Sequence, residues 1–476
     1  MTDALTNTVR HLRAPMLLAL ALAGCDAGSS VDPAAEDGGS STPHAGQTSN
    51  DAPADGGART SRVGFANGDG GVSGSATGRD GGASEPAPSP NRTCGNGGEC
   101  PVVAPGSVHD VDLLFMVDNS GSMREEQAAL RAQFPALVRA LTTGDRDGNG
   151  SEDFAPVNSL HLGVVSSDMG LIGISGIDNC TGLGDDGVMQ NKPSAEVEGC
   201  ATEYPRFLSY QTASGDPEAI ANDLACIATL GTGGCGFEQQ LESTLKALWP
   251  ADDARVVFLP DPQGFGAIGQ GDNGGMNEGF LRNDPARGLS LIAVVLVTDE
   301  EDCSSKDTRH LTPPAFLDPN VPADAELLKQ GLNLRCNFNP ENLYAKERYI
   351  NGLKALRPGN EQLVVFGAIV GVPPDAVNAI PADYATSEPA RSAFYDGIFT
   401  HPRMQPMVDT KGTPEPDDDS MVPSCETAAG RAYPPQRIVE VAQGFGPNGI
   451  VQSICQEDFG PAVEAIVDRI ASLTAP

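Results

Sequence analysis

The sequence predicts an α/β fold, a Rossmann-like and mainly parallel sheet with helices on both faces. Near-continuous apolar runs of strand length alternate with segments whose apolar residues recur at helical spacing. Strands that are apolar on both sides are typical of parallel sheets covered by helices. Long Gly-, Asp- and Cys-rich segments separate some of these runs. We therefore expect one domain, residues 108–474, with long disulfide-tied loop insertions.

The individual elements follow from these periodicities in chain order. A helix over about 123–142 is predicted because Leu130, Phe134, Leu137 and Leu141 lie near helical spacing, and a last helix because Ala462, Ile466 and Ile470 do so. Residues 167–235 are expected to form a loop insertion. The expected elements are strands at about 110–117, 159–167, 256–260, 290–298, 363–370 and 449–455, and helices at about 123–142, 236–249, 341–357 and 458–473.

The first strand runs directly into the sequence Asp118-Asn-Ser120-Gly-Ser122. One carboxylate and two hydroxyls on a short loop before a helix offer hard oxygen ligands, which suit Mg²⁺, or Ca²⁺ in a looser cavity. The loop follows the carboxyl end of a strand, where open α/β sheets bind ligands. A turn that only caps a helix is the simpler alternative for so short a pattern.

These residues resemble the metal-ion-dependent adhesion site of von Willebrand factor type A (vWA) domains. Matched by motif, Asp118, Ser120 and Ser122 take the first three places, and Asp299 takes the later place at the end of an apolar strand. Thr232 is the expected threonine ligand, although a shifted match would put Cys235 there. The resemblance implies a vWA fold, a bound Mg²⁺ (or Mn²⁺ or Ca²⁺), and a protein ligand that offers a carboxylate.

Enzymatic function is not expected. Neither a G-x-S-x-G elbow nor an H-E-x-x-H motif is present. A secreted metal-dependent hydrolase and a calcium-stabilised structural envelope protein remain the alternatives to a cation-dependent binding protein.

A second acidic stretch lies downstream, with candidate calcium ligands at Asp145, Asp147, Asn149 and Asp153. Oxygens at alternate positions around a Gly are typical of a Ca²⁺ loop, but the twelfth position is Pro156 and not the closing Glu of an EF-hand. A looser Ca²⁺ loop and a solvated acidic turn are equally compatible with these residues.

The N-terminus predicts export to the bacterial cell envelope. Arg10 and Arg13 precede a short apolar run that ends at Cys25, and this resembles a lipoprotein signal peptide over residues 1–24. Acylation of Cys25 would anchor the chain to a membrane, inner or outer. Residues 25–107 are expected to be a disordered Gly/Ser/Pro/Asp-rich tether. The folded domain would then be periplasmic or extracellular.

Charge and cysteine content agree with such a location. The net charge of −34 leaves too few cations to neutralise phosphates, so no nucleic-acid partner is expected. Ten cysteines besides Cys25 suit an oxidising compartment. Zinc binding is not expected, because the cysteines lack C-x-x-C spacing. Nearest-neighbour pairing predicts five disulfides: Cys94 with Cys100, Cys180 with Cys200, Cys226 with Cys235, Cys303 with Cys336, and Cys425 with Cys455.

Overall fold

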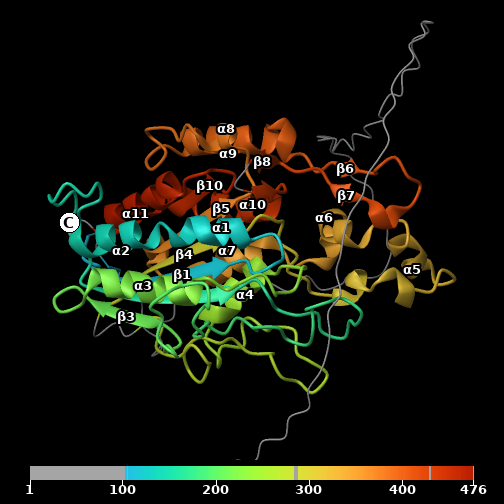
Figure 1. Ribbon diagram of the computed structural model, residues 1–476, viewed down its shortest axis with the longest axis horizontal. Helices are drawn as coiled ribbons and strands as arrows, with labels where there is room; N and C mark the ends of the chain where they lie inside the picture. Colours follow the sequence, from blue (N-terminus) through green and yellow to red (C-terminus); the bar gives the residue numbers. More distant parts are fainter. Residues whose placement is uncertain (1–101, 104–105, 284–287, 428–429, 475–476) are drawn as a thin grey trace, which may run out of the picture. The chain divides into compact units, whose positions relative to one another are not determined.

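The apolar runs form one six-stranded sheet in the computed structural model of the protein (Figure 1). The structure describes residues 102–103, 106–283, 288–427 and 430–474. The sheet contains β1 (Asp110–Val117), β2 (Ser159–Ser166), β3 (Leu208–Gln211), β4 (Leu291–Val297), β5 (Val364–Val370) and β10 (Gly449–Ser453).

Several predictions for the N-terminal part of the chain fall outside the described residues. They concern the signal peptide, the lipidation site Cys25 and most of the tether. Cys94 and Cys100 also lie outside the described residues, so the disulfide predicted between Cys94 and Cys100 stays a prediction.

The strand order is β10-β5-β4-β1-β2-β3, and every neighbouring pair is parallel except β2 with β3. The chain therefore builds outward from β1 through β2 and β3, and then returns to the other side of β1 with β4. This reversal is the topological switch point of a doubly wound sheet, where ligands bind beyond the carboxyl ends of the strands. The predicted mainly parallel α/β fold is confirmed.

Two layers of helices cover the sheet. The side chains of β1 alternate between them: Leu113 and Phe115 pack in one core, and Leu114 and Met116 pack in the other. The first face is covered by α1 (Arg124–Arg131), α2 (Phe134–Thr143), α3 (Pro217–Ala228) and α11 (Gly460–Thr474). The second face is covered by α4 (Gln240–Leu248), α7 (Lys346–Lys354), α9 (Glu388–Thr400) and α10 (Gln436–Gly444).

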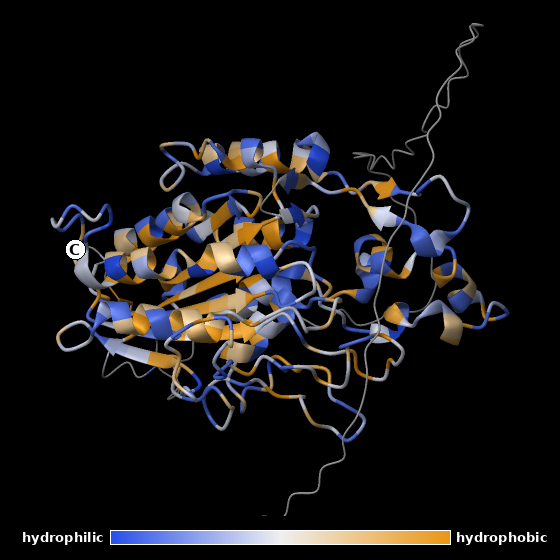
Figure 2. Cartoon of the chain, viewed as in Figure 1, coloured by the Kyte–Doolittle hydropathy of each residue, from blue (hydrophilic) through white to orange (hydrophobic). Residues whose placement is uncertain are grey.

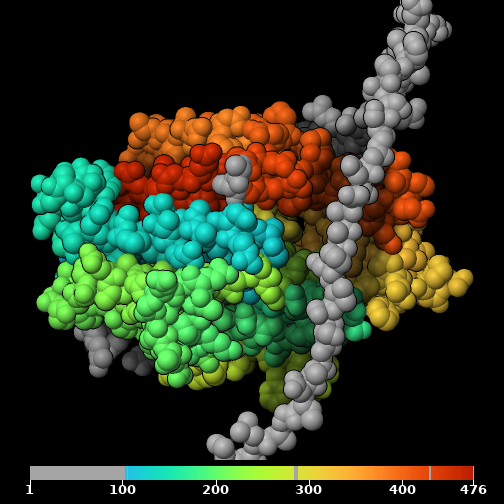
Figure 3. All heavy atoms as spheres, in the orientation of Figure 1, coloured from blue at the N-terminus to red at the C-terminus, as the bar shows by residue number. Residues whose placement is uncertain are grey.

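Hydropathy follows these layers. The central strands β1, β4 and β5 are mostly apolar and the edge strand β3 is more polar, while the helices are apolar toward the sheet and polar outward (Figure 2). On the first face, α1 and α2 lie between α3 and α11 (Figure 3). The smaller elements are α5 (Pro322–Leu327), α6 (Arg335–Phe338), α8 (Pro374–Val377), β6 (Val408–Asp409), β7 (Ser420–Met421), β8 (Cys425–Thr427) and β9 (Gly430–Ala432). No helix within the described residues is long and apolar enough to span a membrane.

Two predicted elements are wrong. The helix expected over 123–142 is two helices, α1 and α2, because Pro135 in the first turn of α2 lacks an N–H and its ring excludes the carbonyl four residues earlier. The strand expected at 256–260 does not form. Val256 and Phe258 are buried and Val257 is exposed, as in a strand, but no neighbouring strand pairs with this segment. The strand β3 and the helices α3, α9 and α10 were not predicted.

Four disulfides tie the described loops, and two of them differ from the nearest-neighbour prediction. Cys303–Cys336 and Cys425–Cys455 form as predicted. In the insertion, Cys180 pairs with Cys235 and Cys200 pairs with Cys226, so one loop is nested inside the other. The predicted pairing of Cys180 with Cys200 and of Cys226 with Cys235 is therefore wrong. The helix α3 carries Cys226 to Cys200, and the loop after α3 brings Cys235 to Cys180 near the start of the insertion.

Candidate metal site

The site begins where β1 ends, next to the end of β4. The parallel register pairs Val117 with Val297, and the Asp118 N–H donates to the Val297 carbonyl (3.0 Å). Asp118 and Asp299 therefore follow adjacent strands at the switch point. Both residues are fully buried. The charge of Asp118 is among the main causes that raise the pKa of Asp299, so the two carboxyl groups share one environment.

The carboxylate of Asp118 is held by donors on both oxygens. Its Oδ1 accepts from the Ser120 N–H (2.8 Å) and the Ser167 hydroxyl (3.2 Å). Its Oδ2 accepts from the Thr298 hydroxyl (2.6 Å), which in turn accepts from Gln240 Nε2 (2.9 Å). Burial raises the pKa of Asp118, and these hydrogen bonds oppose the rise. The carboxylate is thus oriented before any ligand binds.

Asp299 has no such partners. Neither of its carboxylate oxygens accepts a hydrogen bond from the described residues. Burial raises its pKa to about 8, with further contributions from the charges of Asp118 and Glu300. The Ser122 hydroxyl lowers this pKa, but it lies outside hydrogen-bond geometry. A buried carboxylate without a partner is costly, and a bound cation would remove that cost.

The hydroxyls complete an oxygen-rich set. Ser120 Oγ and Ser122 Oγ lie 3.3 Å apart, and the Ser122 side chain is exposed. Two carboxylates and two hydroxyls at one place form a donor set that fits a hard divalent cation such as Mg²⁺. The structure thus brings together Asp118, Ser120, Ser122 and Asp299.

The loop that carries Thr232 lies against the same edge. The Gly234 N–H donates to the Asn119 carbonyl (2.8 Å), and the Gln127 side chain bonds both the N–H and the carbonyl of Gly231. Thr232 itself is half-buried, and among the described residues no hydrogen bond joins its hydroxyl to the carboxylate of Asp118 or Asp299. Its role as a ligand stays a prediction. Cys235, the alternative, is bonded to Cys180 and therefore offers no thiolate.

Further carboxyl groups surround the site. Burial raises the pKa of Glu126, on α1, to about 7, and that of Glu300 to about 7. Burial raises the pKa of Glu238 well above its ordinary value, with the charges of Glu300, Asp118 and Asp299 adding to the rise. The groups that most affect these three pKa values include no basic side chain of the described residues. The site is a buried concentration of carboxyl groups.

Sequence reasoning missed several of these residues. Thr298 and Ser167 each follow a buried strand, and this position was an available signal. No sequence pattern distinguished Glu238 and Glu126, because each lies in a segment that contains further acidic residues. Only the folded chain shows that they approach the pair of aspartates.

The second acidic stretch forms a tight turn. The carboxylates of Asp145, Asp147 and Asp153 lie within 4.8 Å of one another, close enough for one ion. The Asp145 carboxylate already accepts from the N–H groups of Gly148 (2.8 Å) and Gly150 (2.9 Å). Asn149 Oδ1 accepts from the Ser151 N–H (2.8 Å). The turn is therefore satisfied by its own backbone, and both the Ca²⁺ loop and the solvated turn remain compatible with it.

One histidine lies beside a cystine. His310 Nε2 is 3.9 Å from Cys336 Sγ, and His310, Cys303 and Cys336 cluster in the fold although they are spread over the sequence. Because the two cysteines are joined in a disulfide, they offer no thiolates for zinc.

Comparison with protein-family models, curated proteins and solved structures finds no match for the chain. The protein is therefore described by the class of its fold and by the residues of its candidate site. It is a doubly wound α/β domain with disulfide-tied insertions, and it has an acidic, oxygen-lined site at the switch point of its sheet.

Proposed function

We propose that this protein binds another protein through a divalent cation held by Asp118, Ser120, Ser122 and Asp299, in the manner of a vWA domain with a metal-ion-dependent adhesion site. The observation that carries the proposal is the buried Asp299 carboxylate, whose oxygens have no partner among the described residues, beside the oriented carboxylate of Asp118. The position of this pair at the switch point of the sheet supports it.

Each residue has a distinct role in this proposal. Mg²⁺ would supply a Lewis acid for a carboxylate of the partner. Ser120 and Ser122 would offer neutral oxygens, and the exposed side of Ser122 leaves the site open to a partner. Asp118 is fixed by Thr298 and Ser167, so its oxygens need no reorganisation on binding. Thr232 is the proposed additional ligand from the neighbouring loop.

Calorimetric titration of the full chain with Mg²⁺, Mn²⁺ and Ca²⁺ tests the metal site directly. We expect one site for which Asp118→Ala lowers the Mg²⁺ affinity by roughly 100-fold or more, beyond the 10–100-fold of an outer-shell change. Glu464→Gln, an exposed change on α11, is the matched control. A pull-down from envelope extract, with and without chelator, then tests partner binding. Full recovery of partners by Asp118→Ala in chelator would contradict the proposal.

We further propose that the chain is a lipoprotein of the bacterial cell envelope, acylated at Cys25 and tethered by residues 25–107. The basic, apolar and Leu-Ala-Gly-Cys sequence at the N-terminus supports this location. Metabolic labelling with a fatty-acid analogue is expected to mark the protein and to fail for Cys25→Ser. Labelling of Cys25→Ser at the wild-type level would contradict acylation at this position.

A further inference from the structure

A pocket of about 160 Å³ opens beside the metal site. Its walls come from five segments. The loop before α4 contributes Glu238, the loop after β4 contributes Glu300 and Glu301, and the turn after β9 contributes Tyr433, while residues within 333–337 and 420–421 complete the lining. Glu300 directly follows the proposed ligand Asp299. The pocket therefore lies next to the place where a partner carboxylate would bind.

No basic side chain of the described residues lines this pocket. Glu238 is 2% exposed, and its Oε1 has no hydrogen-bond partner among the described residues. Its carboxyl group interacts with that of Glu300. Glu301 accepts from the Arg437 N–H (3.0 Å), which is a backbone contact at the start of α10. Three carboxyl groups thus line one pocket, and one buried oxygen is left without a partner.

Basic side chains that contact the lining residues already have acidic partners. Arg437 bonds Asp302 (3.1 Å), and Arg431, which contacts Tyr433, bonds Glu426 (2.7 Å). Neither arginine lines the pocket. A cationic group of another molecule would therefore not compete with a basic side chain of the lining for these carboxyl groups.

The side chains that line the pocket favour an organic cation over a second metal ion. Among the described residues, these glutamates do not belong to any group of three acidic, His or Cys side chains whose ligand atoms lie within 4.8 Å of one another. The pocket is also lined by Asn333, Asn337 and Tyr433, which suit an ammonium or guanidinium on an aliphatic stem.

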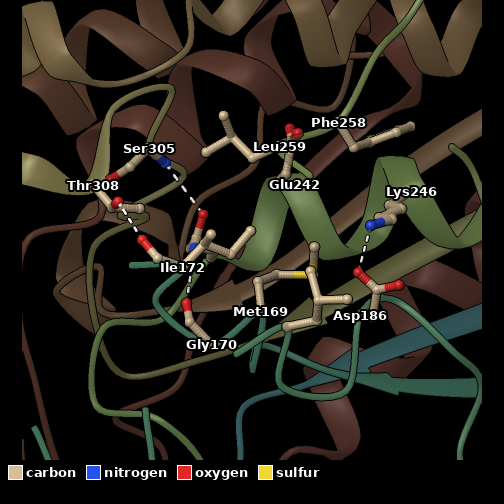
Figure 4. Close-up of a pocket in the computed structure, with 12 residues that line it drawn as sticks. Met169, Gly170, Ile172, Asp186, Glu242, Lys246, Phe258, Leu259, Ser305 and Thr308 are labelled. Carbon is tan, nitrogen blue, oxygen red and sulfur yellow. Dashed lines mark hydrogen bonds and ion pairs between the residues drawn. The ribbon is translucent and has the colours of Figure 1, made fainter. Parts of the chain in front are cut away.

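A pocket beside α4 provides a contrast (Figure 4). Its volume is about 20 Å³, which is room for about one water molecule. Its charged groups are paired within the chain, Lys246 with Asp186 and Glu242 with Arg348 (2.9 Å). That pocket is small and its charged groups are neutralised within the chain, whereas the pocket at Glu238 is larger and acidic.

We propose that the pocket between Glu238, Glu300 and Tyr433 binds a lysine or arginine side chain of the same partner whose carboxylate binds the metal ion. This inference rests on the proposed function and specifies its partner: a segment with an acidic and a basic group close together. The acidic group binds the ion, and the basic group fills the pocket.

Two small probes test the inference on the full, Mg²⁺-loaded chain. Nα-acetyl-lysine carries a carboxylate and an ammonium group, and Nα-acetyl-norleucine carries the same carboxylate on a similar aliphatic chain without the charge. Ligand-observed NMR measures both affinities. We expect acetyl-lysine to bind roughly tenfold more tightly, as one charge-assisted contact provides.

Variants separate the pocket from the general acidity of the surface. Glu238→Gln and Glu300→Gln are expected to reduce the preference for acetyl-lysine to about onefold to twofold. The preference is the ratio of the two affinities, so a change at the metal site affects both probes alike. Glu125→Gln removes an exposed charge close to Glu126 without touching the pocket, and it should keep the preference. Equal affinities of the two probes for the wild type would overturn the inference.

The failures are distinguishable. If Mg²⁺ calorimetry shows two sites in the wild type and one in Glu238→Gln, the pocket binds a metal ion and the inference is wrong. If neither probe responds to Mg²⁺ or to Asp118→Ala, the proposed function fails. A retained acetyl-lysine preference that Glu238→Gln abolishes would still support a cation-binding pocket in that case.

Discussion

Strand β1 has a buried aspartate near its start and another just after its end, and the two have opposite surroundings. Asp112 accepts from the backbone N–H (2.9 Å) and Nε (2.7 Å) of Arg282, and Arg357 Nη2 lies 3.7 Å from Asp112 Oδ2. Asp118 has hydroxyl and backbone donors but no cation among the described residues, and carboxyl groups surround it. The amino edge of the sheet is neutralised within the chain, and the carboxyl edge is not.

This difference distinguishes a carboxylate that arginines of the same chain neutralise from a carboxylate at which we propose a bound cation. A buried charge needs compensation, and at the amino edge the chain supplies it with two arginines. Burial lowers the pKa of Arg357 to about 10, although Asp112 opposes this, so the guanidinium stays charged at neutral pH. At the carboxyl edge the described residues supply none, and an external cation is the expected compensation.

The largest expected effect is on folding at the amino edge. Asp112→Ala leaves the buried Arg357 and the partly buried Arg282 without this counter-charge, and we expect a loss of about 3–5 kcal/mol of unfolding free energy. Guanidinium denaturation measures it. Asp110→Ala is the control, because that side chain is 38% exposed and 3.6 Å from Arg282, and its loss should be below about 1 kcal/mol. Equal losses of unfolding free energy in the two variants would contradict the view that Asp112 neutralises buried charge at the amino edge.

The second effect is on metal binding at the carboxyl edge. Asp299→Asn should lower the Mg²⁺ affinity by roughly 100-fold or more, beyond the effect of an outer-shell change. Without metal, it should leave the protein at least as stable as the wild type, because it removes a buried carboxyl group that must take up a proton when the chain folds at neutral pH. Calorimetry and denaturation in chelator check both statements. A metal-free Asp299→Asn that is less stable by more than about 1 kcal/mol would mean that the carboxylate supports the fold.

The third effect is a pH dependence confined to the carboxyl edge. The pKa values of Asp299 (about 8) and Glu300 (about 7) are raised above those of an unfolded chain, so the folded state binds more protons between about pH 5 and pH 8. The contribution of these two groups to the stability of the metal-free protein should therefore be fully present below about pH 4. It should fall by on the order of 2 kcal/mol between about pH 5 and pH 8.

The affinity for Mg²⁺ should rise over the same pH range, because the ligands must lose their protons. Thermal unfolding in chelator and calorimetry at several pH values measure the two trends. Stability that increases from about pH 5 to pH 8 without metal would contradict the uncompensated charge at this edge.

The smallest effect concerns the orientation of Asp118. Thr298→Val removes the hydroxyl that donates to Asp118 Oδ2, and the Mg²⁺ affinity should fall by about tenfold. Thr298→Ser retains the hydroxyl and should restore most of the affinity. A loss in the serine variant as large as that in the valine variant would show that packing, and not the hydrogen bond, is responsible.

Local patterns explain the elements that sequence reasoning predicted. The apolar runs of β1 and β4 are long enough to be buried on both faces, and each leads to an aspartate at the end of a strand, so the fold class and the central pair of the site follow from adjacent residues. Residues 256–260 have the alternation of a strand but no partner strand in space. Alternation alone cannot provide the hydrogen bonds of a neighbouring strand.

By itself, the sequence determined the sheet-and-helix architecture and the cluster of oxygen-bearing side chains after β1, because periodicity and short motifs depend only on near neighbours. Tertiary structure alone decided which cysteines of the insertion pair, which arginines neutralise Asp112, and that Glu126 and Glu238 approach the two aspartates. These outcomes depend on distance and burial, since a charge acts strongly only over a few ångströms in a medium of low polarity.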